Sequence, residues 1–367
     1  MSLRSTEPLG KEVERPLTHL IKHYFKDMKT TDYNVELTTE RGLRKIELIG
    51  KVCTKQEASI KEDTAPKFVY NRIVDGHTAI LEHEYVYFRL NGYSLDCIKD
   101  FCQLSPYIRL SDDNHYVGFS YRFFIDVIGN SHRTKVRLSR VRYQIAVNDI
   151  FYAMLYLTPE LSNLMYDDED ILSKLHERTH IFQLVERVYD ETILKNAPEI
   201  FNVTFKITTD RGITHELVRH KEDSFMQEST RYCNYSKGKY SHSITVIDPD
   251  FGNMDCEEEW ADAMADAEAH YMNLLEKGAT AQMARSVLPT STKADIYMSG
   301  TLEMWLGEVI TINTPKLKTK EHKGFLPLRN SNHAHPQMIP IAKDIERIIM
   351  DNFKESVYKI KVYEKAD

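Results

Sequence analysis

The chain has 367 residues, which is enough to bury a large core, and its length alone allows two domains. Hydrophobic residues make up 42% of the sequence and charged residues 28%, as is typical of soluble globular proteins. The formal net charge of −7 argues against nucleic acid as a partner, since proteins that bind it present a basic surface to the phosphates.

The N-terminus and the cysteines favour a cytoplasmic protein. No apolar run approaches the roughly 18 residues that a membrane span needs, so we expect no membrane partner. The polar N-terminus lacks the apolar segment of a signal peptide. The five cysteines include no CxxC pair, which favours reduced thiols over disulfides or a zinc site.

The first ninety residues begin with a polar, charged arm at 1–30, which we expect to be mobile and to precede a single domain at 31–367. Loose alternation over 34–48 favours two strands that turn at Arg41-Gly42, and 51–62 has the pattern of a short helix. Aromatic and β-branched side chains predict a strand at 84–90.

His77, Glu82 and His83 stand just ahead of that strand and allow two interpretations. A His, Glu, His set suggests a metal site, but the spacing differs from the H-E-x-x-H arrangement that places two ligands on one helix face. In the other interpretation, backbone carbonyls at the strand start hold the histidines. The spacing argues against metal.

Residues 92–198 are interpreted as a mostly helical insertion in the domain, because the segments on both sides of it belong together. Helices are predicted at 150–157 and 171–194, the latter rich in apolar residues three and four apart. The stretch 132–143 is basic and alternating. It is either a solvated face or a local charge that attracts a nucleotide or a folate polyglutamate.

The clearest strand lies at 201–207, where apolar and polar residues alternate strictly. Asp210-Arg211-Gly212 then turns the chain, and Thr214 is the predicted N-cap of a helix that carries residues 216–220. The later elements are predicted as follows: a strand at 244–247, an amphipathic helical region at 257–285 broken at Gly278, a helix at 293–309, a solvated Lys-rich loop at 314–324, a helix at 340–353 and an edge strand over 357–362.

The stretch 216–236, ELVRHKEDSFMQESTRYCNYS, concentrates cationic and hydroxyl side chains. It is either a charged surface helix or a site for an anion and a flat ring, because guanidinium groups present planar donors that match phosphate. Ser229 is either a nucleophile or a hydrogen-bonding residue, and the absence of a neighbouring His or Asp favours the second. Cys233 is either a reactive thiol or a small packed residue, and again no base lies beside it.

The order of residues in this stretch resembles the signature of the flavin-dependent thymidylate synthases, the ThyX family. Arg219-His220-Lys221 is followed by seven residues, then by Ser229, Thr230, Arg231 and Tyr232; the family has Arg where this chain has Lys221. Three further segments resemble family motifs in family order: Gly76-His77 with Glu82-His83, Ala284-Arg285 with Leu288-Pro289, and Leu328-Arg329 with His333-Ala334. Ala79, Met226, Gln227, Thr301 and Gly307 depart from the family pattern.

The resemblance implies an α/β (α+β) fold, with a twisted, largely antiparallel sheet packed on long helices, and a homotetramer with shared active sites. It implies conversion of dUMP to dTMP, with methylenetetrahydrofolate as carbon donor and FAD, reduced by NADPH, as hydride source. The implied catalytic residues are Arg329 and Ser229. The implied dUMP contacts are Glu216, Arg219, Gln227, Ser229, Arg231, Arg285 and Arg329, and the implied FAD contacts are His77, Glu82, Arg219, His220, Lys221, Thr301 and His333.

Other functions remain open at this stage. The departures from the family pattern, Lys221 and Met226 among them, are compatible with a dUMP hydroxymethylase on the same scaffold. They are also compatible with a catalytically silent relative that binds nucleotide or flavin without turnover. A nucleic-acid module built on residues 132–143 would bind in a salt-sensitive way, and the acidic net charge argues against it.

Overall fold

A computed structural model describes residues 29–128, 145, 148–165, 183–220, 223–252, 254–307, 310–314, 317–322 and 324–360. It mixes helices with largely antiparallel sheets, which confirms the predicted α+β class. Most of the predicted arm, the basic stretch 132–143 and Lys221 lie outside the described residues. No helix within the described ranges is both long and apolar enough to cross a membrane.

The central sheet holds the longest strands of the described fold. Its order is β2-β7-β10-β8, and every neighbouring pair is antiparallel. The strands are β2 (Asn34–Leu37), β7 (Asn202–Asp210), β10 (Lys293–Thr301) and β8 (Ser224–Gln227). The strand predicted at 201–207 is therefore confirmed as β7, and it pairs with β10 along its whole length, from Asn202↔Thr301 to Asp210↔Lys293.

The helix predicted at 293–309 is wrong. Strand β10 occupies its first half, and of the residues described in this range only α14 (Leu302–Leu306) is helical. Strand β10 is buried along nearly its whole length, and its buried residues include the polar Asp295 and Ser299, so its sequence lacks a clear period-two alternation of apolar and polar residues. Thr301 joins the two elements: its side chain accepts a hydrogen bond from the Met304 amide at 3.2 Å and caps α14.

Four other predicted boundaries also differ. Gly42, with φ +63°, begins helix α2 (Gly42–Val52) instead of turning a hairpin, and a 3₁₀ turn, η1 (Glu57–Ser59), replaces the helix predicted at 51–62. The predicted loop at 314–324 contains strand β12 (Leu317–His322), which pairs with β11 (Ile310–Thr314). Helix α16 (Met338–Val357) confirms the helix predicted at 340–353 but extends through Val357, where an edge strand was predicted.

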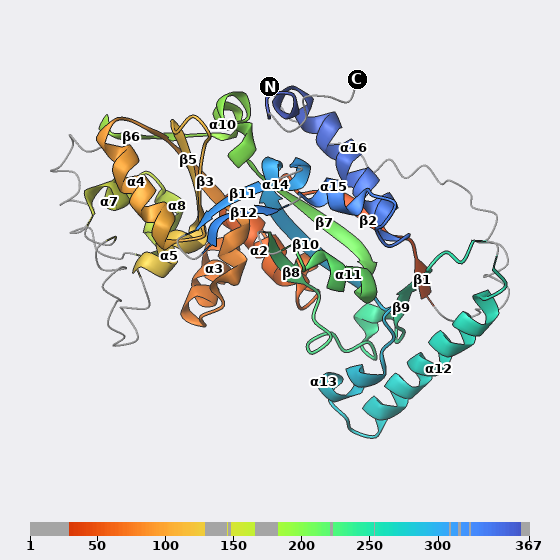
Figure 1. The fold of residues 1–367 in the computed structure, drawn as a ribbon. Helices are drawn as coiled ribbons and strands as arrows, with labels where there is room; N and C mark the ends of the chain where they lie inside the picture. Colours follow the sequence, from red (N-terminus) through yellow and green to blue (C-terminus); the bar gives the residue numbers. More distant parts are fainter. Residues whose placement is uncertain are drawn as a thin grey trace.

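A second antiparallel sheet has the order β4-β5-β3-β6. Its strands are β4 (Ile108–Leu110), β5 (Tyr116–Ser120), β3 (Tyr85–Leu90) and β6 (Val185–Val188). Its helices are α4 (Tyr93–Leu104), α5 (Tyr121–Ile128), α7 (Asp149–Tyr156) and α8 (Pro159–Met165). The next helix, α10 (Asp190–Asn196), packs instead against α16, where the Ser356 hydroxyl donates to the Leu194 carbonyl at 2.8 Å. Residues 171–182 of the helix predicted at 171–194 lie outside the described residues; strand β6 contradicts the prediction at 185–188, and α10 confirms it at 190–194. Helix α7 confirms the helix predicted at 150–157. Figure 1 shows this sheet and its helices to one side of the central sheet.

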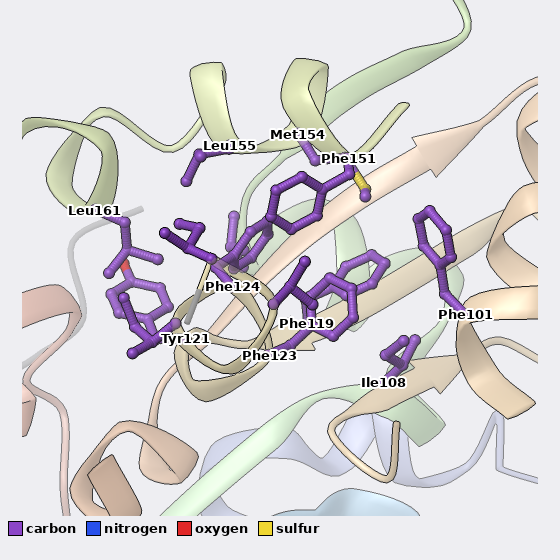
Figure 2. Packing of buried hydrophobic residues seen from close by; sticks show 14 of the residues in the cluster. Phe101, Ile108, Phe119, Tyr121, Phe123, Phe124, Phe151, Met154, Leu155 and Leu161 are labelled. Carbon is purple, nitrogen blue, oxygen red and sulfur yellow. The ribbon is translucent and has the colours of Figure 1, made fainter. Parts of the chain in front are cut away.

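The second sheet has an aromatic core of its own. The ring of Phe119 lies 4.9 Å from that of Phe123, which lies 5.4 Å from Phe124, and Phe151 of α7 packs 5.8 Å from Phe124 (Figure 2). Buried aromatic side chains contribute large apolar areas to stability. The described part of 92–198 is thus organised around strands as well as helices. Its status as an insertion in a single domain stays a prediction.

Polar contacts join the two sheets at η2 (Thr78–His83), the 3₁₀ segment ahead of β3. Asn202 of β7 donates from its side chain to the His83 carbonyl at 2.8 Å and from its amide to the Tyr87 hydroxyl at 2.8 Å. The His83 ring is fully buried, with Nδ1 2.6 Å from the Ser299 hydroxyl of β10. Burial and the nearby Lys45 lower the pKa of His83 to about 3, so it is a neutral structural residue.

Helix α12 (Glu257–Glu276) and the short α13 (Ala281–Ala284) project from the opposite side of the central sheet (Figure 1). Gly278, with φ +91°, separates them as predicted. Strand β9 (Thr245–Ile247) confirms the short strand expected there, and it pairs in parallel with β1 (Lys29–Thr31), at the end of the predicted arm.

Glu303 of α14 is expected to make the free energy of unfolding depend on pH. Burial, with Asp112 and Glu199 nearby, raises the pKa of Glu303 to about 7. An acid whose folded pKa lies above its unfolded value of about 4.3 binds more protons in the folded state, so its contribution to stability falls as pH rises between these values. We expect Glu303→Gln to match the wild type at pH 5 and to be more stable by about 1–3 kcal/mol at pH 8.

Thermal unfolding at the two pH values measures this difference. Glu276→Gln, which removes an exposed carboxylate at the end of α12, serves as the control and should change stability equally at both. A Glu303→Gln effect that is the same at pH 5 and pH 8 would contradict the assignment.

Candidate active site

The stretch 216–236 is not one surface helix. Helix α11 (Arg211–Leu217) begins directly after β7, and the Asp210 side chain caps it by accepting from the Ile213 amide at 2.7 Å. Asp210, and not Thr214 as predicted, is therefore the N-cap. The helix ends at Leu217, so Arg219 and His220 lie beyond it, and β8 then runs along the edge of the central sheet.

Arg329 brings two distant motifs together. It ends the short helix α15 (Phe325–Arg329), and its guanidinium reaches back to the end of α11. Nη1 donates to the Glu216 carboxylate at 2.8 Å, Nη2 to the Glu216 carbonyl at 2.9 Å, and Nε to His220 Nε2 at 2.9 Å. Three of the predicted site residues thus form one hydrogen-bonded group, which the planar donor array of arginine makes possible.

His220 is held as a neutral ring. Burial and the cationic Arg329 lower its pKa to about 4, so it carries no charge near pH 7. Because Arg329 donates to Nε2, the proton of the neutral ring is assigned to Nδ1. The Phe325 ring packs 5.0 Å from it. His220 therefore presents an oriented, flat, polar ring.

A second group forms around the turn that follows β8. The Ser229 amide donates to the Cys53 carbonyl at 3.1 Å, and the Ser229 hydroxyl accepts from the Arg231 amide at 3.3 Å. The Arg231 side chain donates to Gln282 of α13 at 3.2 Å, and Arg285 follows three residues later. Arg231 and Arg285 are both exposed. The Arg231–Gln282 contact thus joins the serine turn to the segment that carries Arg285, and two exposed arginines from separate motifs are suited to an anion.

Gln227 connects the two groups. Its side-chain amide donates to the Thr214 hydroxyl of α11 at 2.8 Å, which fixes the end of β8 against the helix that carries Glu216. Among the described residues, no His or carboxylate is hydrogen-bonded to the Ser229 hydroxyl, so its geometry favours hydrogen bonding over nucleophilic attack. Burial raises the pKa of the Cys233 thiol, which favours the interpretation of Cys233 as a packed residue.

Glu82 joins the motif that begins at Gly76 to strand β8, which lies within the stretch 216–236. One carboxylate oxygen accepts from the Ser224 hydroxyl of β8 at 3.1 Å, and the other is ion-paired with Arg122 of α5. Arg122 also lies 4.9 Å over the Tyr107 ring. Sequence reasoning did not find Arg122, because it lies within the predicted insertion and belongs to none of the motifs.

The remaining predicted residues that are described make no side-chain contact with these groups, although the Arg219 amide donates to the Glu216 carbonyl at 3.3 Å. His77, Arg219 and His333 are exposed, which leaves their side chains available to a ligand. Thr301 is buried, and its hydroxyl already caps α14. Within the described ranges, no group of three or more His, Cys, Asp or Glu side chains is arranged to hold a metal ion.

The α+β fold thus brings arginine, histidine and serine side chains from separate motifs together beside the central sheet, and side chains of these types are suited to an anionic ligand. The model of a family described as thymidylate synthase complementing protein matches residues 150–353, more than half of the chain. The chain therefore belongs to this family, the flavin-dependent thymidylate synthases, a family of enzymes, which confirms the predicted resemblance.

Individual relatives are distant. The chain is 28% identical over 162 residues to a probable flavin-dependent thymidylate synthase of Paramecium bursaria Chlorella virus 1, covering 41% of this chain and 67% of the relative. It is 29% identical over 135 residues to the flavin-dependent thymidylate synthase of Synechocystis sp. (34% and 62%), and 27% identical over 128 residues to that of Pyrococcus abyssi (35% and 46%). The chain thus spans from under half to about two thirds of these relatives' lengths.

Proposed function

We propose that the chain converts dUMP to dTMP, with methylenetetrahydrofolate as the carbon donor and FAD, reduced by NADPH, as the source of hydride. The observation that carries this proposal is the contact of Arg329 with Glu216 and His220, since it unites two motifs more than a hundred residues apart. Membership of the flavin-dependent thymidylate synthase family supports it. A homotetramer with shared active sites in the cytoplasm, without nucleic-acid or membrane partners, belongs to the same proposal.

The dUMP phosphate would be held by arginines. Arg219, Arg231 and Arg285 are exposed, and guanidinium groups bind phosphate through paired N–H donors. Ser229 would add a hydroxyl between them. Glu216 and Gln227 would act mainly by orientation, because Glu216 fixes Arg329 and Gln227 fixes the end of β8.

Arg329 would act on the uracil ring. A guanidinium has five N–H bonds, and the described contacts use one on each of its three nitrogens. Two N–H bonds remain to donate to a ring oxygen or nitrogen. The positive charge, already oriented by Glu216 and His220, would stabilise negative charge on the ring as its C5 carbon becomes nucleophilic.

The residues near His220 fit a flavin. A neutral, half-buried imidazole beside an exposed arginine offers a flat polar contact next to a cation, as an isoalloxazine ring and a pyrophosphate require. His77, Glu82, Arg219, His220, Lys221 and His333 would hold the cofactor, and Thr301 has the least support because its hydroxyl is already used. When bound, the flavin supplies the hydride; the protein residues bind, orient and exclude water.

Absorbance spectroscopy tests this function directly. We expect the purified protein with added FAD to show a bound-flavin spectrum that bleaches with NADPH under anaerobic conditions, and faster when dUMP is present. Product analysis with methylenetetrahydrofolate should then give dTMP; a hydroxymethylated product would instead identify the dUMP hydroxymethylase. Absence of flavin binding at high FAD concentration would contradict the proposal, and binding without turnover would indicate a silent relative.

A further inference from the structure

Four buried or half-buried charges meet immediately before Ser229. Lys55 lies in the loop after α2, Glu228 follows β8, and Lys293 and Asp295 belong to β10. The Lys293 ammonium lies 3.2 Å from Glu228 and 2.8 Å from Asp295, and the Lys55 ammonium lies 3.3 Å from Glu228 and contacts Asp295. Two cations thus balance two carboxylates that are almost fully buried. We call these four residues the charge cluster.

The charge cluster is built into the central sheet. The other oxygen of Asp295 accepts from the Thr208 hydroxyl of β7 at 2.7 Å. The Glu228 amide donates to the Asp295 carbonyl at 2.8 Å, and the Glu228 carbonyl accepts from Arg211 at 3.0 Å. Both backbone groups of Glu228 are therefore fixed, so its position defines where the next residue, Ser229, begins.

The loop that carries Lys55 also holds the Ser229 turn. The Cys53 carbonyl accepts from the Ser229 amide at 3.1 Å, and the Ser229 carbonyl accepts from the amides of Tyr232 and Cys233. Lys55 has φ +52°, a left-handed conformation that non-glycine residues adopt at a cost of about 1 kcal/mol or more. Its ion pairs with Glu228 and Asp295 offset that cost and keep the loop in place. The same loop thus supports the turn in two ways, through a backbone hydrogen bond from Ser229 and through the ion pairs of Lys55.

We infer that Lys55 is a positioning residue: through the charge cluster it holds the Ser229–Tyr232 turn in the geometry that presents the Ser229 hydroxyl and Arg231 to the substrate anion. The inference rests on the proposed function for the identity of that anion, a nucleoside monophosphate. Lys55 itself need not touch the substrate. Removing its charge would leave two buried carboxylates with one cation, and breaking a buried pair in this way disturbs the surrounding structure.

Lys55→Met tests the inference, with Lys51→Met as the matched control. Lys51 lies in the last turn of α2, the helix before the Lys55 loop, and pairs with the buried Glu47 at 2.7 Å, but its side chain has no contact with the turn in the described structure. We expect Lys55→Met to speed amide hydrogen exchange over 229–233 on the order of tenfold, and Lys51→Met to leave it unchanged. We also expect a KM for dUMP raised by about tenfold or more in Lys55→Met with kcat changed far less, and near-normal values in Lys55→Arg.

The two measurements separate the inference from the proposed function. Unchanged exchange over 229–233 in folded Lys55→Met overturns the inference, whatever the protein's activity. Faster exchange with an unchanged KM overturns it as well. If the wild type neither binds flavin nor converts dUMP, the proposed function fails, and the exchange data alone decide whether Lys55 positions the turn. Should Lys55→Met not fold, the charge-balanced pair Lys55→Met with Asp295→Asn takes its place under the same criteria.

Discussion

Replacing Arg329 with lysine is expected to lower kcat/KM for dUMP by about 10²- to 10³-fold, the usual cost of losing a donor aimed at developing charge. Lysine keeps the positive charge but has only a compact ammonium, so it cannot contact Glu216 at two atoms and His220 at a third. In the proposed function, the orientation of the charge toward the uracil ring depends on these contacts. The loss corresponds to about 3–4 kcal/mol of transition-state stabilisation.

A second measurement reports on the pKa of His220. Since Arg329 helps to hold the pKa of His220 down, Arg329→Leu should raise that pKa toward the usual value, which NMR titration of the ring would detect. The control for Arg329→Lys is Arg347→Lys. Arg347 is exposed on α16 and pairs with Asp344, outside the site, so its replacement should leave kcat/KM unchanged. A kcat/KM for Arg329→Lys within a few-fold of the wild type would show that Arg329 does not act on the ring.

The sequence was sufficient to predict those parts of the fold in which one pattern dominates. Strand β7 alternates strictly along its first residues, and α16 repeats apolar residues at helical spacing, so both could be predicted from periodicity. Strand β10 could not, because its buried residues include polar side chains such as Asp295 and Ser299, which find polar partners inside the fold. Apolar residues therefore do not mark its buried positions, and its sequence was wrongly assigned as a helix.

The residues of the candidate site also fall into those that the sequence could predict and those that it could not. Arg329, Glu216 and His220 were candidates because their motifs resemble the family's, and the structure brings them into contact. Arg122 and Lys55 were missed, since each contacts a motif residue only through the folded chain and carries no spacing signal of its own. Residues that support a site from another element are visible in a structure but rarely in a sequence pattern.

Replacing Trp305 with alanine is expected to destabilise the protein by about 3–5 kcal/mol, the usual range for a buried tryptophan or phenylalanine. Trp305 is fully buried in α14, its ring lies 5.0 Å from Phe205 and 5.1 Å from Phe325, and its indole N–H donates to the Val203 carbonyl at 3.2 Å. The substitution removes a large apolar contact and leaves that buried carbonyl without this donor. Thermal unfolding measures the loss.

The same substitution should also disturb the candidate site, because Phe325 packs on both Trp305 and His220. Phe151→Ala provides the comparison: it removes a fully buried aromatic ring of the second sheet's core, so it should cost a similar free energy of unfolding but leave the packing behind His220 intact. At a temperature where both variants remain folded, we expect Trp305→Ala to weaken dUMP binding by about tenfold or more, and Phe151→Ala to change it little. Equal dUMP affinities in the two variants would mean that Phe325 and His220 keep their positions without Trp305, and that packing behind His220 does not control the site.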